Sequence, residues 1–232
     1  MKRRIGLLIV AAMLLIPLSA GAQPARKTEP QNLNVYGSGF GLNIALTNSG
    51  FGLGGYMMRS ITSTTSLLAD LMITTVKDER EQRFFNFFGE SIIPNKENYL
   101  HVMPLQIGFQ KRLFKESIED NFRPYLHVSA GPTLGWVSPY YDDDNGNGRR
   151  DIGEDVNDII SAFPKGSLEW GMGGTLAIGA HFGISKRVTQ GIRFGYAFQW
   201  FPNQVQLLEP FESPSEEFFG TPTLTLSFGK LN

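Results

Sequence analysis

Apolar residues alternate with small or polar ones along most of the chain beyond residue 33. In the segment 36–46, the even positions are apolar apart from Ser38, and the odd positions are Gly37, Gly39, Gly41, Asn43 and Ala45. Successive side chains of a β-strand point to opposite faces. This segment therefore predicts a strand with one apolar face and one small face.

The same alternation returns in the segments 66–74, 99–110, 122–136, 169–184, 192–200 and 221–228. The segment 51–61 is irregular, and its Gly54-Gly55 pair predicts a β-bulge that swaps the parity. Together the segments predict an all-β fold, an antiparallel up-and-down transmembrane β-barrel of about eight strands.

The alternation by itself does not say which face is inside. In a soluble sandwich or a lipocalin-like barrel, the large apolar side chains point inward. Here charged residues stand in mid-strand on the small face, namely Asp70, Arg123, Glu169 and Arg193. They favour a narrow polar lumen, with the apolar face toward lipid.

The predicted connections alternate in length. Those near 62–65, 113–121 and 185–190 are short, whereas those near 77–98, 137–167 and 201–220 are long, with 47–50 as the short exception on the second side. Outer-membrane barrels combine short periplasmic turns with long outer loops. Aromatic residues at strand ends are expected at the outer interface, on the lipid-facing parity: Tyr99, Trp136, Trp170 and Trp200.

The N-terminus predicts an export signal. Basic residues at 2–4 precede an apolar run over 5–18, and Ala20-Gly21-Ala22 forms a small-x-small cleavage site. A membrane helix would need about 20 apolar residues, so removal is favoured over anchoring. We expect a signal peptide at 1–22, a flexible lead-in at 23–32 and a barrel domain at 33–232. The absence of cysteine excludes a disulfide framework and a lipoprotein anchor.

Composition narrows the function classes. Charged residues make up 19% of the chain, below the roughly one quarter that is usual in soluble domains. The formal net charge is -1, which gives no support for nucleic acid as a partner.

The chain resembles the small outer-membrane β-barrels of the OmpA/OmpX-like superfamily. The resemblance rests on the signal peptide, the alternation, the loop asymmetry and the closing segment 221–228, whose Phe228 is similar to the recognition signal of barrel-assembly substrates. It departs from that pattern because residues 229–232 follow Phe228. The resemblance implies a place in the bacterial outer membrane, part of the cell envelope, with outer-membrane lipids and the barrel-assembly machinery as partners. It does not imply a particular activity.

One motif is specific. Within the long outer loop 137–167, the stretch from Asp143 to Glu154 matches the calcium-loop pattern D-x-[DN]-x-[DN]-G-x₅-E. The expected ligands are Asp143, Asn145, Asn147, the backbone carbonyl of Arg149, Asp151 and Glu154. This stretch resembles EF-hand-like and dockerin-like loops, except that Arg150 stands where an apolar residue usually packs. We expect a structural Ca²⁺ rather than a sensor, and the alternative is a solvated acidic loop tip.

Other signals are weaker. The glycines at 50, 52 and 55 match a dinucleotide fingerprint, but the residues after them continue a strand. Of the histidines, His101 is expected to face lipid, while His127 and His181 face the lumen, where they can meet across adjacent strands. The charged stretch 78–83 precedes an aromatic cluster at 84–88, which is a candidate contact surface.

These observations favour a structural or surface-interaction barrel with a narrow or closed lumen, because an eight-stranded barrel is just wide enough for side chains to fill. The alternative is a porin-like small pore or a conduit for hydrophobic ligands. An outer-membrane lipid-modifying enzyme ranks third, and the sequence yields no catalytic residues. An extracellular ligand or partner is not identified by the sequence.

Overall fold

The computed structural model describes residues 38–85, 91–118, 122–144, 146–147, 150–151, 154–183, 188–209 and 215–231. The chain divides into two units, Met1–Asn32 and Leu33–Asn232, and the described residues belong to the second. The expected signal peptide and lead-in lie outside the described residues. No helix within these ranges is long and apolar enough to cross a membrane.

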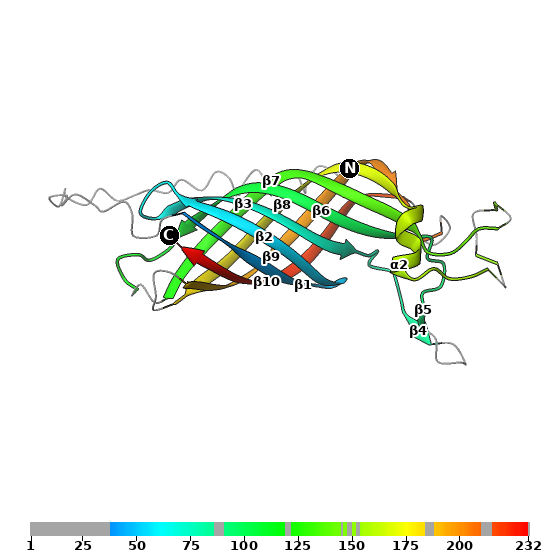
Figure 1. Cartoon of the computed structure of the whole chain (residues 1–232), viewed down its shortest axis with the longest axis horizontal. Helices are drawn as coiled ribbons and strands as arrows, with labels where there is room; N and C mark the ends of the chain where they lie inside the picture. Colours follow the sequence, from blue (N-terminus) through cyan, green and yellow to red (C-terminus); the bar gives the residue numbers. More distant parts are fainter. Residues whose placement is uncertain are drawn as a thin grey trace, which may run out of the picture. The chain divides into compact units, whose positions relative to one another are not determined.

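Eight strands close into an antiparallel barrel (Figure 1). Strands that follow one another along the chain pair with one another, so the predicted up-and-down barrel is confirmed. The barrel strands are β1 (Gly39–Thr47), β2 (Gly50–Ser60), β3 (Thr65–Val76), β6 (Asn98–Arg112), β7 (Phe122–Pro139), β8 (Ser167–Phe182), β9 (Val188–Val205) and β10 (Glu216–Leu231).

The long connections carry small elements of their own. Between β3 and β6, β4 (Phe84–Phe85) pairs with β5 (Ser91–Ile92) in a separate two-stranded sheet. Between β7 and β8 lie a single helical turn, α2 (Ile159–Ala162), and the 3₁₀ turn η2 (Phe163–Lys165). These elements gather at the end of the barrel opposite the short turns (Figure 1). We call the two ends the long-loop end and the short-turn end.

The barrel is closed by pairing its first strand with its last. The register runs from Gly39 opposite Leu231 to Thr47 opposite Thr223, without interruption. Closure gives every barrel strand a partner on both sides, so the barrel has no free edge of unpaired backbone groups.

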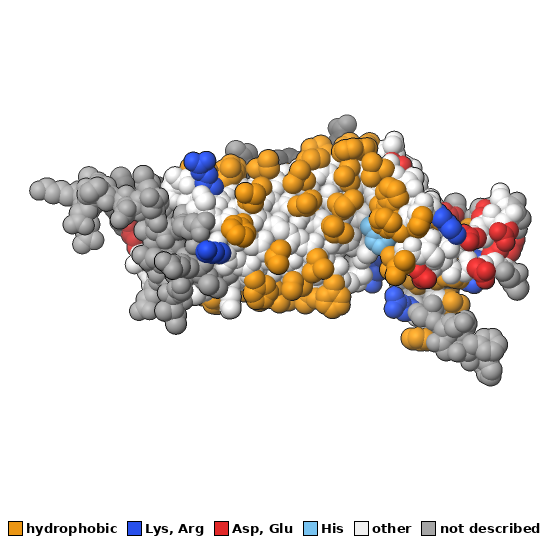
Figure 2. All heavy atoms as spheres, viewed as in Figure 1, with side chains coloured by type: hydrophobic (Ala, Val, Ile, Leu, Met, Phe, Trp, Pro, Cys, Tyr) orange, Lys and Arg blue, Asp and Glu red, His pale blue; other side chains and the backbone are white. Residues whose placement is uncertain are grey.

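The apolar face of each strand points outward. Leu42, Ile107 and Ile178 are 68%, 61% and 62% exposed, whereas inward-facing Asp70 and Arg193 are 7% and 6% exposed. Apolar side chains accordingly form a band on the outer wall of the barrel (Figure 2). This arrangement excludes the lipocalin-like alternative and confirms the predicted polar lumen.

The apolar band is bordered by different residue types at its two ends. At the short-turn end, outward-facing Arg59, Lys111 and Lys230 are exposed. Toward the long-loop end, Trp170 is exposed on the outer wall as expected, at 61%. Tyr99 also has the predicted outward parity, and its hydroxyl donates to the Asn157 carbonyl of the outer loop at 3.1 Å.

The irregular second segment contains no bulge. Its pairing with β1 and with β3 runs without a register shift through Gly54 and Gly55. The apparent change of parity comes from Tyr56 and Met58, which are large residues on the inner face and are buried there. A Cβ added at Gly41 would meet the Tyr56 ring, so glycine in β1 leaves room for that ring.

The last two strands are longer than predicted. β9 continues to Val205 and β10 begins at Glu216, which shortens the connection expected at 201–220. Parity does continue beyond Trp200, but the inward residues Phe201 and Val205 are apolar. A rule that expects small or polar inward residues therefore ends β9 too early.

Candidate functional site: the filled lumen and the outer mouth

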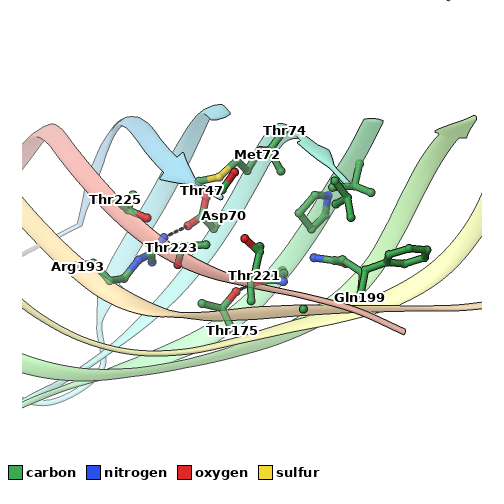
Figure 3. A pocket seen from close by; sticks show the side chains of 17 residues that line it. Thr47, Asp70, Met72, Thr74, Thr175, Arg193, Gln199, Thr221, Thr223 and Thr225 are labelled. Carbon is green, nitrogen blue, oxygen red and sulfur yellow. Dashed lines mark hydrogen bonds and ion pairs between the residues drawn. The ribbon is translucent and has the colours of Figure 1, made fainter. Parts of the chain in front are cut away.

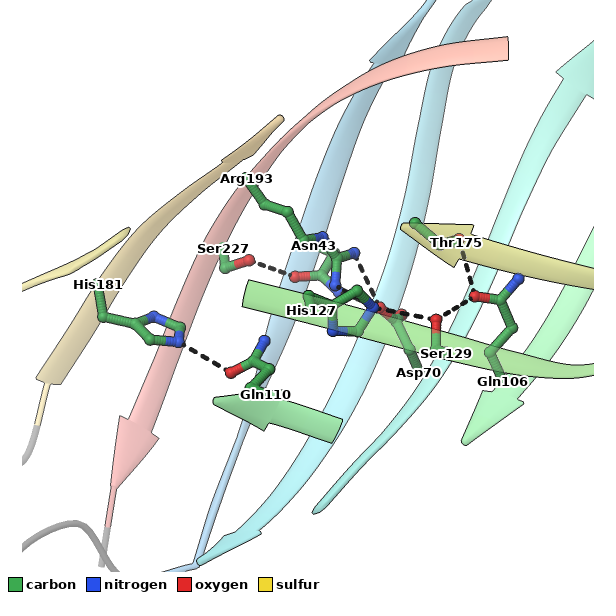
Figure 4. A network of polar contacts seen from close by, with 10 residues as sticks. All are labelled: Asn43, Asp70, Gln106, Gln110, His127, Ser129, Thr175, His181, Arg193 and Ser227. Carbon is green, nitrogen blue, oxygen red and sulfur yellow. Dashed lines mark hydrogen bonds and ion pairs between the residues drawn. The ribbon is translucent and has the colours of Figure 1, made fainter. Parts of the chain in front are cut away.

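A buried ion pair joins β3 and β9 across the lumen (Figure 4). Arg193 Nη2 on β9 lies 3.0 Å from Asp70 Oδ2 on β3, and the two side chains are 7% and 8% exposed. Asn43 Nδ2 on β1 donates to both Asp70 oxygens at 3.1 Å. Ser227 on β10 in turn donates to Asn43 Oδ1 at 2.7 Å. The charge of Asp70 is thus paired and hydrogen-bonded, as a buried carboxylate requires.

A second chain of hydrogen bonds lies beside the ion pair. Ser129 Oγ donates to Gln106 Oε1 at 2.7 Å, and Thr175 donates to the same oxygen at 2.9 Å. His127 Nε2 lies 3.0 Å from Ser129 Oγ and 3.4 Å from Arg193 Nη1, which can only donate. Because the hydroxyl proton of Ser129 points at Gln106 and not at His127, the Ser-His pair is not arranged as a nucleophile and its base.

His127 and His181 do not meet, contrary to the sequence-based expectation. His127 is opposite Ala177, while His181 is opposite Arg123 at a more distant position of the ladder. The His181 ring instead stacks on Tyr125, with 4.5 Å between centroids, and its Nε2 lies 3.2 Å from Gln110 Oε1. His101 has the outward parity that was predicted, but Phe163 of η2 packs near it, with 6.4 Å between ring centroids.

A small cavity remains in the middle of the lumen, and its lining includes six threonines (Figure 3). Its volume is about 50 Å³. A water molecule needs about 10–15 Å³ on this scale, so the cavity holds a few waters at most. Thr133 donates to Gln199 Oε1 at 2.6 Å across the same level of the barrel.

An apolar cluster closes the lumen above this cavity. Its buried members are Val76, Leu100, Val102, Phe201, Val205, Leu207 and Phe219. The Phe201 ring occupies the space over Gly135 and Gly171, where an added Cβ would meet it. The sequence analysis missed this cluster because it expected only small or polar side chains on the inner face, whereas the inner-face glycines leave room for a ring from another strand.

A buried ion pair lies in the outer mouth. Lys96 Nζ is 2.6 Å from Glu81 Oε2, and both side chains are 4% exposed. The ammonium also lies 5.1 Å from the centre of the Tyr99 ring. Burial lowers the pKa of Lys96 from its usual value and the positive charges of Arg83 and Lys77 lower it further, whereas Glu81 acts in the opposite direction.

Backbone hydrogen bonds tie the three long connections to one another. Glu97 N donates to the Leu207 carbonyl at 2.9 Å, Tyr140 N to the Glu97 carbonyl at 2.7 Å, and Asn157 N to the Tyr140 carbonyl at 2.8 Å. The segments before β6, after β7 and after β9 therefore form one connected layer over the mouth.

The expected calcium loop is only partly described, because Asn145 and Arg149 lie outside the described residues. Asp143 Oδ1 accepts from Gly146 N at 2.7 Å and from Asn147 N at 3.1 Å. Asn147 Nδ2 donates to Asp151 at 2.8 Å, and Asp151 N donates to Glu154 at 2.8 Å. These hydrogen bonds join residues of the motif to one another, so the described part of the loop folds back on itself. Among the described residues, however, no group of three acidic, His or Cys side chains is placed to hold a metal ion.

No protein-family model and no curated protein matches this chain, but solved structures do. The Neisserial surface protein A is 12% identical, with 84% of this chain and 92% of that chain covered and a TM-score of 0.39. The N-terminal β-barrel domain of Pseudomonas aeruginosa OprF is 9% identical, with 83% and 96% covered and a TM-score of 0.40. Ail, the attachment invasion locus protein of Yersinia pestis, is 11% identical, with 84% and 96% covered and a TM-score of 0.39.

The aromatic cluster predicted as a contact surface is described only at its start. Phe84 and Phe85, which form β4, are 51% and 74% exposed. Residues 86–88 lie outside the described ranges.

Proposed function

We propose that the protein is a bacterial outer-membrane β-barrel with a closed lumen, which anchors a connected layer of loops at the cell surface. The observation that supports this most directly is the exposed apolar band around a closed barrel with a charged and hydrogen-bonded interior. In water such a surface would be costly. In a bilayer, a closed barrel satisfies all of its backbone groups while its apolar side chains contact lipid.

The position of the loops gives the orientation. Apart from the β1–β2 turn, the short turns lie at one end and the elaborated connections at the other (Figure 1). By the asymmetry usual for outer-membrane barrels, the long-loop end faces the medium and the short-turn end faces the periplasm.

A closed lumen favours an anchoring or surface-interaction role over diffusion. The ion pair of Asp70 and Arg193, the apolar cluster and the layer over the mouth obstruct the barrel at successive levels. The remaining cavity of about 50 Å³ is far smaller than the pockets of about 300–1,000 Å³ that hold small molecules.

Electrical recording tests this proposal directly. Protein extracted from outer-membrane fractions in detergent and inserted into planar bilayers should give no stable conductance steps. Protease protection in vesicles, showing that the protein is inserted, serves as the control. Uniform, reproducible steps would instead support the small pore, and recovery of the processed chain without detergent would contradict the membrane location.

Calcium binding by the outer loop is the second part of the proposal. The motif supplies carboxylate and amide oxygens in calcium-loop order, and four of its members, Asp143, Asn147, Asp151 and Glu154, are joined by hydrogen bonds within one short segment. We expect weak binding, with a dissociation constant of about 10⁻⁴–10⁻³ M as in extracellular modules.

Calorimetry with matched variants tests the calcium site. The folded barrel should bind Ca²⁺ with measurable heat, and Asp143→Ala should abolish it. Asp144→Ala is the matched control, because Asp144 is also exposed and acidic but occupies a position of the motif that supplies no ligand. Absence of heat at millimolar Ca²⁺, or equal loss in both variants, would contradict the site.

A further inference from the structure

A groove of about 460 Å³ lies on the outside of the barrel at its long-loop end. It is bounded by the β1–β2 turn, the ends of β3 and β6, and the connection between those two strands. The proposed function does not involve this groove.

The floor of the groove belongs to the outer wall of the barrel. Thr75 of β3 and His101 of β6 are opposite one another in the ladder, and both line the groove. Two residues further into the barrel wall on the same parity, Ile73 is 55% exposed and belongs to the apolar band. The groove therefore begins where the wall changes from apolar to polar. Figure 2 shows a histidine and basic side chains at this margin of the band, near the arm formed by β4 and β5.

Positive charge exceeds negative charge in the groove. Lys77, Arg83 and Lys96 line it together with the single carboxylate of Glu81. Glu81 is already paired with Lys96 at 2.6 Å. Within the described part of the chain, Lys77 and Arg83 form no ion pair. Among the described residues, the groove thus presents two cations with which no carboxylate forms an ion pair.

The groove also contains a polar atom without a partner among the described residues. His101 Nε2 is buried and makes no hydrogen bond to the protein. Buried polar atoms are nearly always hydrogen-bonded, so an exception calls for an explanation such as a bound group. The remaining lining includes the Tyr99 ring and Ile159, which is 46% exposed. The groove is therefore cationic on one side and apolar on the other.

We propose that this groove binds the phosphate-bearing headgroup of a lipid in the outer leaflet. Lysine and arginine are the side chains that pair best with phosphate oxygens. A lipid is favoured over free phosphate because the groove adjoins the apolar band, along which acyl chains would lie. This inference rests on the proposed location in the outer membrane.

Binding of phosphorylated lipid A to the detergent-solubilised barrel tests the inference, measured by native mass spectrometry or thermophoresis. The double variant Lys77→Gln/Arg83→Gln should weaken binding by about tenfold or more, since it removes both unpaired cations that would contact the phosphate. The double variant Lys111→Gln/Lys230→Gln is the matched control, because it removes the same charge from the outer wall at the short-turn end. It should leave the affinity unchanged.

Three results would overturn the inference. The two double variants could lose affinity equally, dephosphorylated lipid A could bind as well as the phosphorylated form, or inorganic phosphate could displace the lipid at similar concentrations. The last result would assign the groove to free phosphate. Heat-modifiable migration of each variant on a gel verifies folding. A barrel that requires detergent but shows no phosphate preference would refute only this inference and not the proposed membrane location.

Discussion

Replacing Asp70 by alanine should lower the free energy of unfolding by about 3–5 kcal/mol. The guanidinium of Arg193, whose side chain is 7% exposed, would lose the carboxylate that neutralises it. Asn43 would also lose the acceptor of both its amide hydrogen bonds. Urea unfolding of the barrel in phospholipid vesicles measures the effect.

Two further variants separate a lost charge partner from general damage. Asp70→Leu/Arg193→Leu removes both charges and should recover much of the stability, because no unpaired charge remains in the lumen. Lys165→Ala breaks an ion pair with Asp142 whose side chains are 44% and 40% exposed, and should have a far smaller effect. If Asp70→Ala lowered the free energy of unfolding as little as Lys165→Ala, the part of the lumen around Asp70 would have to be open to water.

Replacing Ile107 by arginine should destabilise the barrel by about 2–4 kcal/mol, the cost of a cation on the lipid face near the bilayer midplane. Ile107 is 61% exposed and lies on the same face as Lys111, four residues along β6. At about 3.3 Å per residue and a tilt near 40°, this places Ile107 roughly 10 Å inside the charged rim.

Ile61→Arg is the matched control for this variant. Ile61 is 53% exposed, but it lies in the turn after β2, at the short-turn end of the barrel. Arginine near an interface costs only about 0–1 kcal/mol. In a water-soluble protein both substitutions would place a charge on an already exposed position and neither would be costly. Equal stability of the two variants would therefore refute the assignment of the outer wall to hydrocarbon.

The strands were predictable wherever they cross the apolar band. There the outer face must be apolar and the inner face must fit a narrow lumen, so the parity is visible in the sequence. Segments such as 99–110 and 122–136 show it clearly, and β6 and β7 contain them. Beyond the band this requirement ends, which is why the ends of β9 and β10 were misplaced.

The packing inside the barrel was less visible. Tyr56 and Phe201 point inward and are accommodated by glycines on other strands, so their fit depends on register rather than on local sequence. The ion pair of Asp70 and Arg193 joins residues far apart in the chain, although both had been placed on the lumen face. The contact of His127 with Ser129 could have been found, because residues two apart on a strand share a face.

The contacts within the outer mouth could not be predicted from the sequence. Lys96 and Glu81 belong to a connection without periodicity, and nothing in their spacing indicates an ion pair. The bonds that link Glu97 to Leu207 and to Tyr140 join separate connections. The calcium motif is the opposite case: its ligands follow from spacing alone, and Ca²⁺ binding stays a prediction.

The pairing of β1 with β10 has a consequence for biogenesis. The contacts between neighbouring hairpins form between nearby segments, but the hydrogen bond from Ser227 to Asn43 spans 184 residues. The seam therefore cannot form until both β1 and β10 have reached the membrane. Until then the open sheet has unpaired backbone N–H and C=O groups on its two edge strands, and such edges are prone to aggregate. Ring closure is thus expected to be the slow, final event of insertion, and substitutions at this seam should delay maturation more than those within any internal hairpin.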